Sequence, residues 1–466
     1  MVQPEKALLL DKPEPKKSGL STFLAAICIV DVFGVFPIVA LAKPILNCGE
    51  YGIIILLIVV VVQMYTAILL GKSWMIARNI NDNIQERCPY KALAELSCGT
   101  KVAGFVSLLL NITIFTAGVP NIIVASQNLE LLGVRISDFN LSYCYWMIVI
   151  GIFICPILWL GSPKDMKCLC ASSVMIVILV FLLLIICLLK IEESPRNFPS
   201  DLTLTFLENV ALAYGVISFQ FDIHPTILTI QVDMNNQKNI SKTIIMGFLI
   251  TLSMFGVVYK LICVKFGMSI SESLLESLPP TIFLHLCALL VAFQLILSLA
   301  VGNTALYQQI ENSLGISRDF NFYRCIIRSF ITILGVIIAE SVPRFDVVMA
   351  VIGGTLTGPL IYIFPPIFYI KMLHLKSDAS DDLLMEDIIQ DPSKLQEIHV
   401  KYGFSYMNRY KSSIKLSKTE KIEFFICILV LIFGILGTIA TTYVNLKNAY
   451  IFSNFTSPCI YNLTVL

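Results

Sequence analysis

Three ionisable residues stand inside long apolar stretches of this chain and are the first candidates for chemistry. Asp31 lies in IVDVFGVFP, and Asp222 and His224 lie in AYGVISFQFDIHP. Ionisable groups are costly at membrane depth and are functional candidates by default. A carboxylate and an imidazole can each take up and release a proton, which predicts a proton-coupling role for the three residues. Two plainer interpretations stay open: Asp31 in a structural ion pair, and Asp222 and His224 at the membrane interface.

Both stretches also contain residues that break helices. Gly34 and Pro37 follow Asp31, and Gly215 and Pro225 flank Asp222. A broken helix exposes N–H groups that can receive a carboxylate and carbonyls that can receive an ammonium group. A zwitterionic amino acid carries both groups, so we expect one to bind where the two breaks meet. The residues expected to contact it are Val32, Phe33, Gly34, Phe36, Tyr214, Gly215, Ser218 and Phe219.

The elements that must position these residues are membrane helices. The chain has 466 residues, of which 57% are hydrophobic and 14% charged, with a mean hydropathy of +0.82. A soluble domain carries about 25% charged residues, and about 20 apolar residues span a bilayer as a helix. Eleven segments fit that length, although the ninth is interrupted by Arg328. They are residues 20–46, 53–70, 102–129, 139–163, 171–189, 203–232, 243–259, 277–310, 325–341, 347–370 and 424–446.

The two broken segments are the first and the sixth, five positions apart. This spacing is typical of transporters built as an inverted five-plus-five repeat, whose broken helices meet at mid-membrane. The predicted fold is therefore an all-α membrane protein with eleven transmembrane helices, of which helices 1 and 6 are broken. The expected parts are a cytosolic tail (1–19), two five-helix repeats (20–190 and 203–372), a cytosolic loop (373–420), an eleventh helix (421–446) and an extracytosolic tail (447–466).

The placement of basic residues predicts the orientation. With a cytosolic N-terminus, 25 of the 33 Lys and Arg residues fall inside and 8 outside, as the positive-inside rule expects. The glycosylation sequons at Asn140, Asn454 and Asn462 then fall outside. The first segment is too long for a signal peptide, so we expect no cleaved leader. The sequence EKALLL, from Glu5 to Leu10, matches an acidic dileucine sorting signal, which favours an endolysosomal or vesicular membrane; the plasma membrane is the alternative.

Other classes of function find little support in the composition. A net charge of +1 does not indicate a nucleic-acid partner. The 14 cysteines are scattered without metal-ligand spacing, and we interpret them as small buried hydrophobes. No metal or cofactor is expected. No nucleophile elbow, HExxH or phosphate-binding loop occurs, so the chain is not expected to be an enzyme.

Five segments resemble, in order, segments of the amino acid/auxin permease family within the amino acid–polyamine–organocation superfamily, and are most similar to animal vesicular inhibitory and proton-coupled amino acid transporters. They are CPYKALAELSCG (88–99), ILWLGSPKDMK (157–167), AYGVISFQFDIHPTILTIQVDM (213–234), LSLAVGNTALYQQIENSLG (297–315) and ESVPRFDVVMAVIGGTLTGPLIYIFPP (340–366). The resemblance implies the inverted-repeat fold and secondary active transport of small amino acids, driven by protons or sometimes by sodium.

Two departures from the family pattern fall at the expected site. Only Gly34 stands where the family carries a Gly-x-Gly stretch, and Asp222 and Ile223 replace a glycine before His224. A relative that senses or binds an amino acid without moving it, a channel, and a sodium-coupled transporter are therefore the alternatives.

Overall fold

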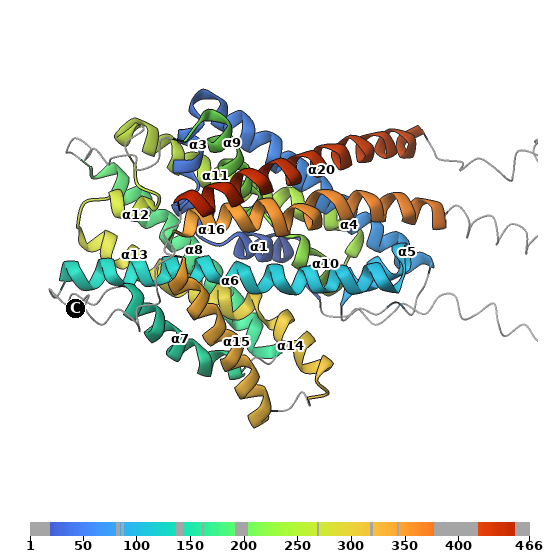
Figure 1. Cartoon of the computed structure of the whole chain (residues 1–466), viewed down its shortest axis with the longest axis horizontal. Helices are drawn as coiled ribbons and strands as arrows, with labels where there is room; N and C mark the ends of the chain where they lie inside the picture. Colours follow the sequence, from blue (N-terminus) through green and yellow to red (C-terminus); the bar gives the residue numbers. More distant parts are fainter. Residues whose placement is uncertain are drawn as a thin grey trace, which may run out of the picture.

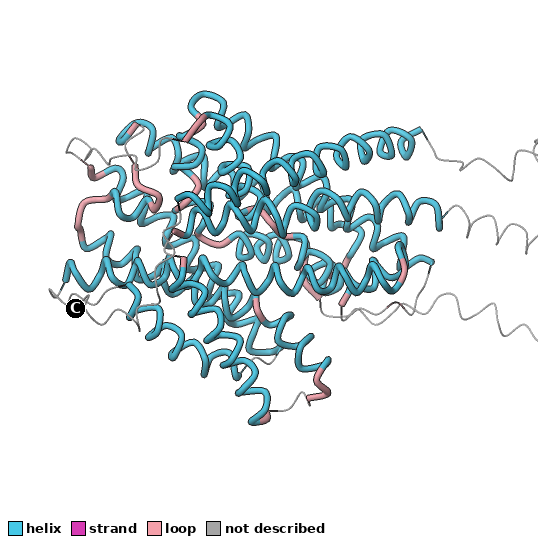
Figure 2. Tube along the Cα trace, viewed as in Figure 1, coloured by secondary structure: helices cyan, strands magenta, loops and turns pink. Residues whose placement is uncertain are grey.

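The structure is a bundle of long helices that run side by side along the longest axis of the molecule (Figure 1). It is a computed structural model, and it describes residues 19–80, 84, 88–136, 143–160, 163–191, 204–267, 270–316, 320–342, 344–376 and 418–452. Helices and short connections make up almost all of this part of the chain (Figure 2). The predicted class, an all-α membrane protein, is confirmed.

Eight helical segments of the described residues are long and apolar enough to cross a membrane. The tenth span, Phe345–Lys376, includes two π-helical stretches, η3 (Gly353–Thr357) and η4 (Pro359–Ile363). The helices of these segments are α4 (Gly52–Ile80), α6 (Thr100–Ile136), α8 (Pro163–Leu189), α11 (Ile240–Phe266), α13 (Ile282–Gly302), α15 (Phe322–Ser341), α16 (Phe345–Ile352), which opens the tenth span, and α20 (Lys418–Phe452).

The other three predicted segments are also helical, but shorter or broken. The fourth is α7 (Tyr143–Leu160). The first comprises α1 (Thr22–Phe33), α2 (Phe36–Val39) and α3 (Ala42–Asn47), and the sixth comprises α9 (Phe206–Gln220) and α10 (His224–Asp233). The helix breaks predicted from glycine and proline thus occur in these two segments.

Short helices fill the connections between the long ones. α5 ends at Gly99, whose φ of +88° a residue with a side chain rarely adopts. α14 follows α13 after a one-residue break, whereas the predicted segment 277–310 runs across this break without interruption. The short elements are η1 (Gly49–Tyr51), α5 (Pro89–Cys98), η2 (Gln237–Asn239), α12 (Leu274–Ser277) and α14 (Thr304–Ser313).

Backbone hydrogen bonds join the start of the first span to the end of the sixth. The N–H of Leu20 donates to the carbonyl of Asp233 at 2.8 Å, and the N–H of Asn235 donates to the carbonyl of Leu20 at 3.0 Å. Because backbone groups at membrane depth need partners within the protein, these bonds satisfy groups that neither helix satisfies itself. They hold the residues just before α1 beside the end of α10.

The charge that interrupts the ninth span is buried and paired. Arg328 is 1% exposed, and its Nε donates to Glu311 Oε1 on α14 at 2.6 Å. Its Nη1 donates to the carbonyl of Leu158 at 2.5 Å, and its guanidinium lies 5.2 Å from the centre of the Tyr307 ring. A charge in the apolar part of a membrane protein is tolerated when it is paired inside the bundle, which reconciles Arg328 with a spanning helix.

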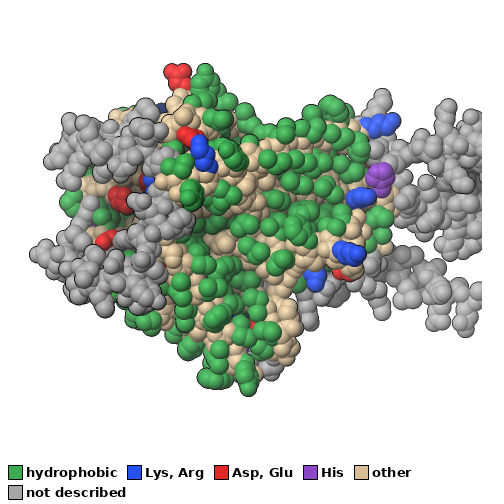
Figure 3. Space-filling model, in the orientation of Figure 1, with side chains coloured by type: hydrophobic (Ala, Val, Ile, Leu, Met, Phe, Trp, Pro, Cys, Tyr) green, Lys and Arg blue, Asp and Glu red, His purple; other side chains and the backbone are tan. Residues whose placement is uncertain are grey.

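The middle of the molecular surface is apolar, and charged side chains gather towards its two ends (Figure 3). Large hydrophobic side chains point outward on several spans, among them Phe153 at 70% and Phe330 at 66% exposure. Such a band suits contact with lipid rather than water. One cysteine corrects the interpretation of cysteines as buried hydrophobes, because Cys144, at the start of α7, is disulfide-bonded.

Candidate functional site

The break in the first span is built around Gly34. Its φ of +62° costs a residue with a side chain roughly 1–2 kcal/mol, and a Cβ there would lie 2.8 Å from Nε2 of Gln294 on α13. The Gln294 side chain is fully buried; its Nε2 donates to Ser173 Oγ at 3.3 Å, and its Oε1 has no hydrogen-bond partner. An unpaired amide oxygen buried beside a helix break is a place where a donor from a ligand can bind.

The break in the sixth span is held by α4. Gln63 Nε2 donates to the carbonyl of Ser218, in the last turn of α9, at 3.0 Å. One turn along α4, Thr66 Oγ1 lies 3.0 Å from Nε2 of His224, the first residue of α10. Residues three apart share one face of a helix, so this face of α4 contacts both sides of the break.

Asp222 and His224 form a connected pair at this break. Asp222 Oδ1 accepts from the backbone N–H of His224 at 3.0 Å and lies 3.2 Å from its Nδ1. The His224 side chain is fully buried, and that of Asp222 is 8% exposed. Both side chains are thus enclosed by the protein, and their depth in the membrane stays a prediction. Asp31 is buried on α1 at 6% exposure, three residues before Gly34.

The hydrogen bonds around His224 depend on which of its ring nitrogens carry a hydrogen. The hydroxyl of Thr66 donates to the carbonyl of Gln63 at 3.0 Å, so its oxygen is left to accept from His224 Nε2. A carboxylate at Asp222 accepts from Nδ1 on the other side of the ring. Both contacts are complete only when both ring nitrogens carry a hydrogen, as in the imidazolium form. A neutral ring requires one of the two bonds to break or the Thr66 hydroxyl to turn.

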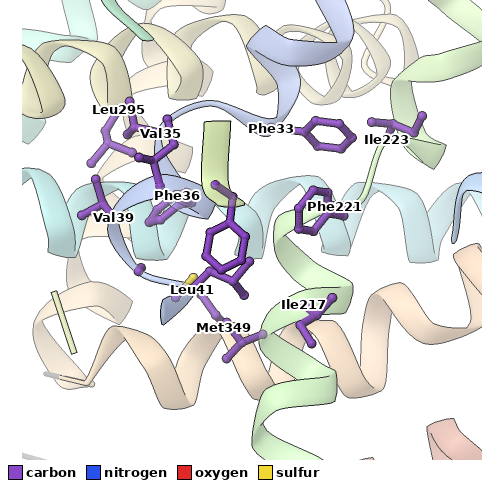
Figure 4. Close-up of a cluster of buried hydrophobic side chains, with 14 of the residues drawn as sticks. Phe33, Val35, Phe36, Val39, Leu41, Ile217, Phe221, Ile223, Leu295 and Met349 are labelled. Carbon is purple, nitrogen blue, oxygen red and sulfur yellow. The ribbon is translucent and has the colours of Figure 1, made fainter. Parts of the chain in front are cut away.

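Aromatic side chains bring the two breaks together (Figure 4). The rings of Phe36 and Phe219 meet edge-on with their centres 6.2 Å apart, and those of Phe33 and Phe221 at 5.2 Å. Figure 4 shows further apolar side chains around the same space, including Met349. The predicted residues Phe36 and Phe219 thus meet, and the surroundings of the breaks are predominantly apolar.

The other predicted residues of the sixth span face the tenth and eleventh spans. The Tyr214 ring lies 5.7 Å from that of Tyr362 and 6.2 Å from that of Phe433 on α20. Ser218 Oγ lies 2.9 Å from the hydroxyl of Tyr362. A Cβ at Gly215 would overlap with the backbone of α16, so this glycine permits close helix packing. Val32, on α1, is partly buried against the hydrophobic core.

Four polar residues near the breaks are not among the contact residues expected from the sequence: Gln63, Thr66, Gln294 and Tyr362. Gln63 bonds to the sixth-span break at Ser218, and Gln294, which bonds to Ser173 on α8, lies beside Gly34. A single polar side chain in an apolar run was the only signal that the sequence offered. Which break a glutamine contacts depends on tertiary packing, which a periodic pattern does not contain.

A second ionisable cluster lies at the end of the bundle where α3 and α16 meet the α11–α13 connection. Arg344 Nη2 is 2.7 Å from Asp346 Oδ2 and 3.9 Å from Glu272 Oε1. Burial and the neighbouring Asp346 carboxylate raise the pKa of Glu272 to about 7, while Arg344 and Lys43 act in the opposite direction. Among the residues that the structure describes, no three His, Cys, Asp or Glu side chains form a group able to hold a metal ion.

Comparisons with known proteins identify the family of this chain. A family profile described as transmembrane amino acid transporter protein matches residues 19–390, most of the chain. The chain belongs to the transmembrane amino acid transporter family. The resemblance drawn from five sequence segments is thereby confirmed, and the family consists of transporters rather than enzymes.

Similar proteins occur among plant transporters. The chain is 24% identical over 338 residues to the amino acid transporter AVT1B of Arabidopsis thaliana, which covers 70% of this chain and 60% of that protein. It is 23% identical over 349 residues to AVT1C of the same plant, covering 73% and 62%. The matched part therefore spans less than two thirds of the length of either relative.

One solved structure supports the fold. The crystal structure of MhsT in complex with L-phenylalanine superposes with a TM-score of 0.52 and 12% sequence identity, and the match covers 91% of this chain and all of that chain. At this identity the likeness concerns the fold alone. It agrees with the all-helical fold of this chain.

Proposed function

We propose that this protein is a secondary active transporter of small neutral amino acids, which bind between the breaks of spans one and six. The observation that carries the proposal is the meeting of the two breaks, where Phe36 and Phe219 pack together and the unpaired amide oxygen of Gln294 lies beside Gly34. In the proposed complex the backbone of Val32–Phe36 and the Gln294 oxygen receive the polar groups of the substrate. The family supports the amino acid class of the substrate.

The proposed size and polarity of the substrate follow from the surrounding side chains. The side chains around the breaks are apolar. Figure 4 shows Phe33, Phe36, Phe221 and Met349 there, and the ring of Phe219 packs against that of Phe36. An apolar wall offers no compensation for burying a charged side chain, which costs several kcal/mol when unpaired. Small uncharged side chains are therefore favoured over cationic or acidic ones.

Proton coupling is proposed to run through Asp222, His224 and Thr66. Loss of the proton from His224 breaks a contact to Thr66 or Asp222, and both lie at the sixth-span break. A proton bound there stabilises the arrangement in which α10 is held against α4, and its release loosens that arrangement. Asp31 is the second proposed carrier, on the inner half of the first span. Sodium is the alternative coupling ion.

The proposed membrane arrangement keeps the eleven spans, the inverted repeat and the cytosolic N-terminus. The end of the bundle that holds Lys72, Lys376 and α5 is then cytosolic, and the start of α7 is extracytosolic. The disulfide at Cys144 supports this orientation, because disulfides persist in oxidising compartments. The proposed membrane is endolysosomal or vesicular, with the plasma membrane as the alternative.

The test is uptake of labelled neutral amino acids by proteoliposomes that contain Gly34→Ala, compared with Gly256→Ala. Gly34→Ala forces a side chain into the left-handed region and against Gln294, so uptake should fall at least tenfold. A Cβ at Gly256, on α11, meets no atom within 4 Å, so this control should match the wild type. Equal uptake by both variants would remove the site from the first-span break.

A further inference from the structure

A cavity of about 460 Å³ opens at the cytosolic end proposed above, far along the tenth span from the helix breaks. Its walls come from the end of α5 and the end of the tenth span. Leu96, Ile370 and Leu375 supply apolar surface, and Ser97, Lys371 and His374 supply polar groups. The cavity thus combines an apolar wall with two nitrogen groups that can bind an anion.

The two nitrogen-bearing side chains differ from their neighbours in having no partner. Lys72 is paired with Glu423 at 2.5 Å, and Lys376 with Glu420 at 3.0 Å. No described residue forms a hydrogen bond or ion pair with Lys371 or His374. Unlike Lys72 and Lys376, Lys371 and His374 are therefore available to bind an anion at the cavity.

The hydroxyl of Ser97 indicates which second group a ligand of this cavity would carry. Its hydrogen is directed to the carbonyl of Leu93 at 2.6 Å, so its oxygen is left to accept. A fully ionised phosphate has no hydrogen to give to it, whereas an ammonium or hydroxyl group of a lipid headgroup does. Lys371 and His374 suit the phosphate, and Ser97 suits the polar remainder of the headgroup.

We propose that this cavity binds the headgroup of an anionic phospholipid of the cytosolic leaflet. The phosphate contacts Lys371 and His374, and the first part of the acyl chains lies against Leu96, Ile370 and Leu375. Anionic lipids are concentrated in that leaflet, and each basic side chain near it contributes about 1 kcal/mol. Figure 3 shows Lys or Arg side chains and a His side chain at one end of the apolar surface.

A free phosphate compound would offer the same anionic group without acyl chains. The apolar half of the cavity lining favours the lipid, because it has no role for a small hydrophilic anion. The proposal does not depend on the transported substrate or on the coupling ion.

The test measures the unfolding midpoint of the purified full-length protein in detergent against the concentration of dioctanoyl phosphatidylserine. The double variant Lys371→Gln/His374→Gln should bind roughly 25-fold more weakly than wild type, since each basic side chain accounts for about fivefold. The matched control, Lys91→Gln/Lys101→Gln, also removes two exposed basic side chains at this end and should bind as wild type does. Dioctanoyl phosphatidylcholine should not distinguish the proteins.

Three outcomes would overturn the proposal. Equal binding by wild type and the double variant would remove the site from the cavity. An equal loss of binding in the control variant would show that basic side chains at this end attract the lipid in general, without a specific site. Equal protection by soluble glycerophosphoserine would show that the acyl chains contribute nothing and that the ligand is a free phosphate compound. If the double variant does not fold, Lys371→Gln alone should bind about fivefold more weakly.

Discussion

At the scale of single residues, the contact between Thr66 and His224 is proposed to depend on whether the His224 ring is protonated, because the Thr66 hydroxyl has a single hydrogen to donate. Thr66→Val keeps the shape of the side chain but removes the oxygen 3.0 Å from His224 Nε2. An unsatisfied buried donor costs about 1–3 kcal/mol, so the protonated form should become less favourable and proton-driven uptake should fall roughly tenfold. Exchange of amino acids without a proton gradient should fall less.

The matched control is Thr116→Val on α6. The hydroxyl of Thr116 contacts only carbonyls of its own helix, Ile112 at 2.8 Å and Thr113 at 3.1 Å. This variant should therefore transport as wild type does under both conditions. If Thr66→Val and Thr116→Val both keep full proton-driven uptake, the proposed link between Thr66 and His224 is wrong.

Gln294 permits a second test at this scale. Gln294→Leu removes the unpaired oxygen beside Gly34 but keeps a side chain of similar length. If the oxygen receives a polar group of the substrate, the concentration for half-maximal uptake should rise about tenfold, as for the loss of a hydrogen bond to a charged group. An unchanged half-maximal concentration would assign Gln294 to helix packing alone.

At the scale of elements, Glu272 connects the α11–α13 connection to the start of the tenth span. Its raised pKa of about 7 means that the folded protein holds this proton more tightly than the unfolded chain. The stability contributed by the proton is therefore lost as the pH rises from about 4.5 to about 7. The side chain is 35% exposed, so solvent screens part of the effect.

Between pH 8 and pH 5.5, the unfolding temperature of wild type should rise by about 1–2 °C more than that of Glu272→Gln. Glu50→Gln removes an exposed carboxylate in η1 and should keep the wild-type dependence on pH. The measurement is thermal unfolding of the three proteins over this range of pH. The same slope in wild type and Glu272→Gln would show that other groups account for it.

The elements were predictable from the sequence to different degrees. Helices and the two breaks follow from apolar runs interrupted by Gly34 and Pro225, because glycine and proline act locally. The partners of the breaks were not predictable, because Gln63 and Gln294 reach them from helices distant in sequence. The break between α13 and α14 was also not predictable, because no proline marks it in the sequence.

At the scale of the whole molecule, the asymmetry of basic residues decides the orientation, which remains a prediction. The sequons at Asn140, Asn454 and Asn462 lie outside the described residues. We expect Asn454→Gln/Asn462→Gln to lose most of the mobility shift that a glycosidase produces in the wild type. Asn239→Gln, in η2 at the proposed cytosolic end, should change nothing. Cleavage of the 377–417 segment by protease added outside intact cells would contradict the orientation.

At this scale, we propose that a proton gradient drives an amino acid through the meeting point of spans one and six. The most direct measurement is uptake of a labelled small neutral amino acid into proteoliposomes of the purified protein, with a proton or a sodium gradient imposed separately. The account predicts accumulation under the proton gradient that is lost in Asp222→Asn and in His224→Ala. Uptake that requires sodium, ignores the proton gradient and survives both substitutions would contradict it.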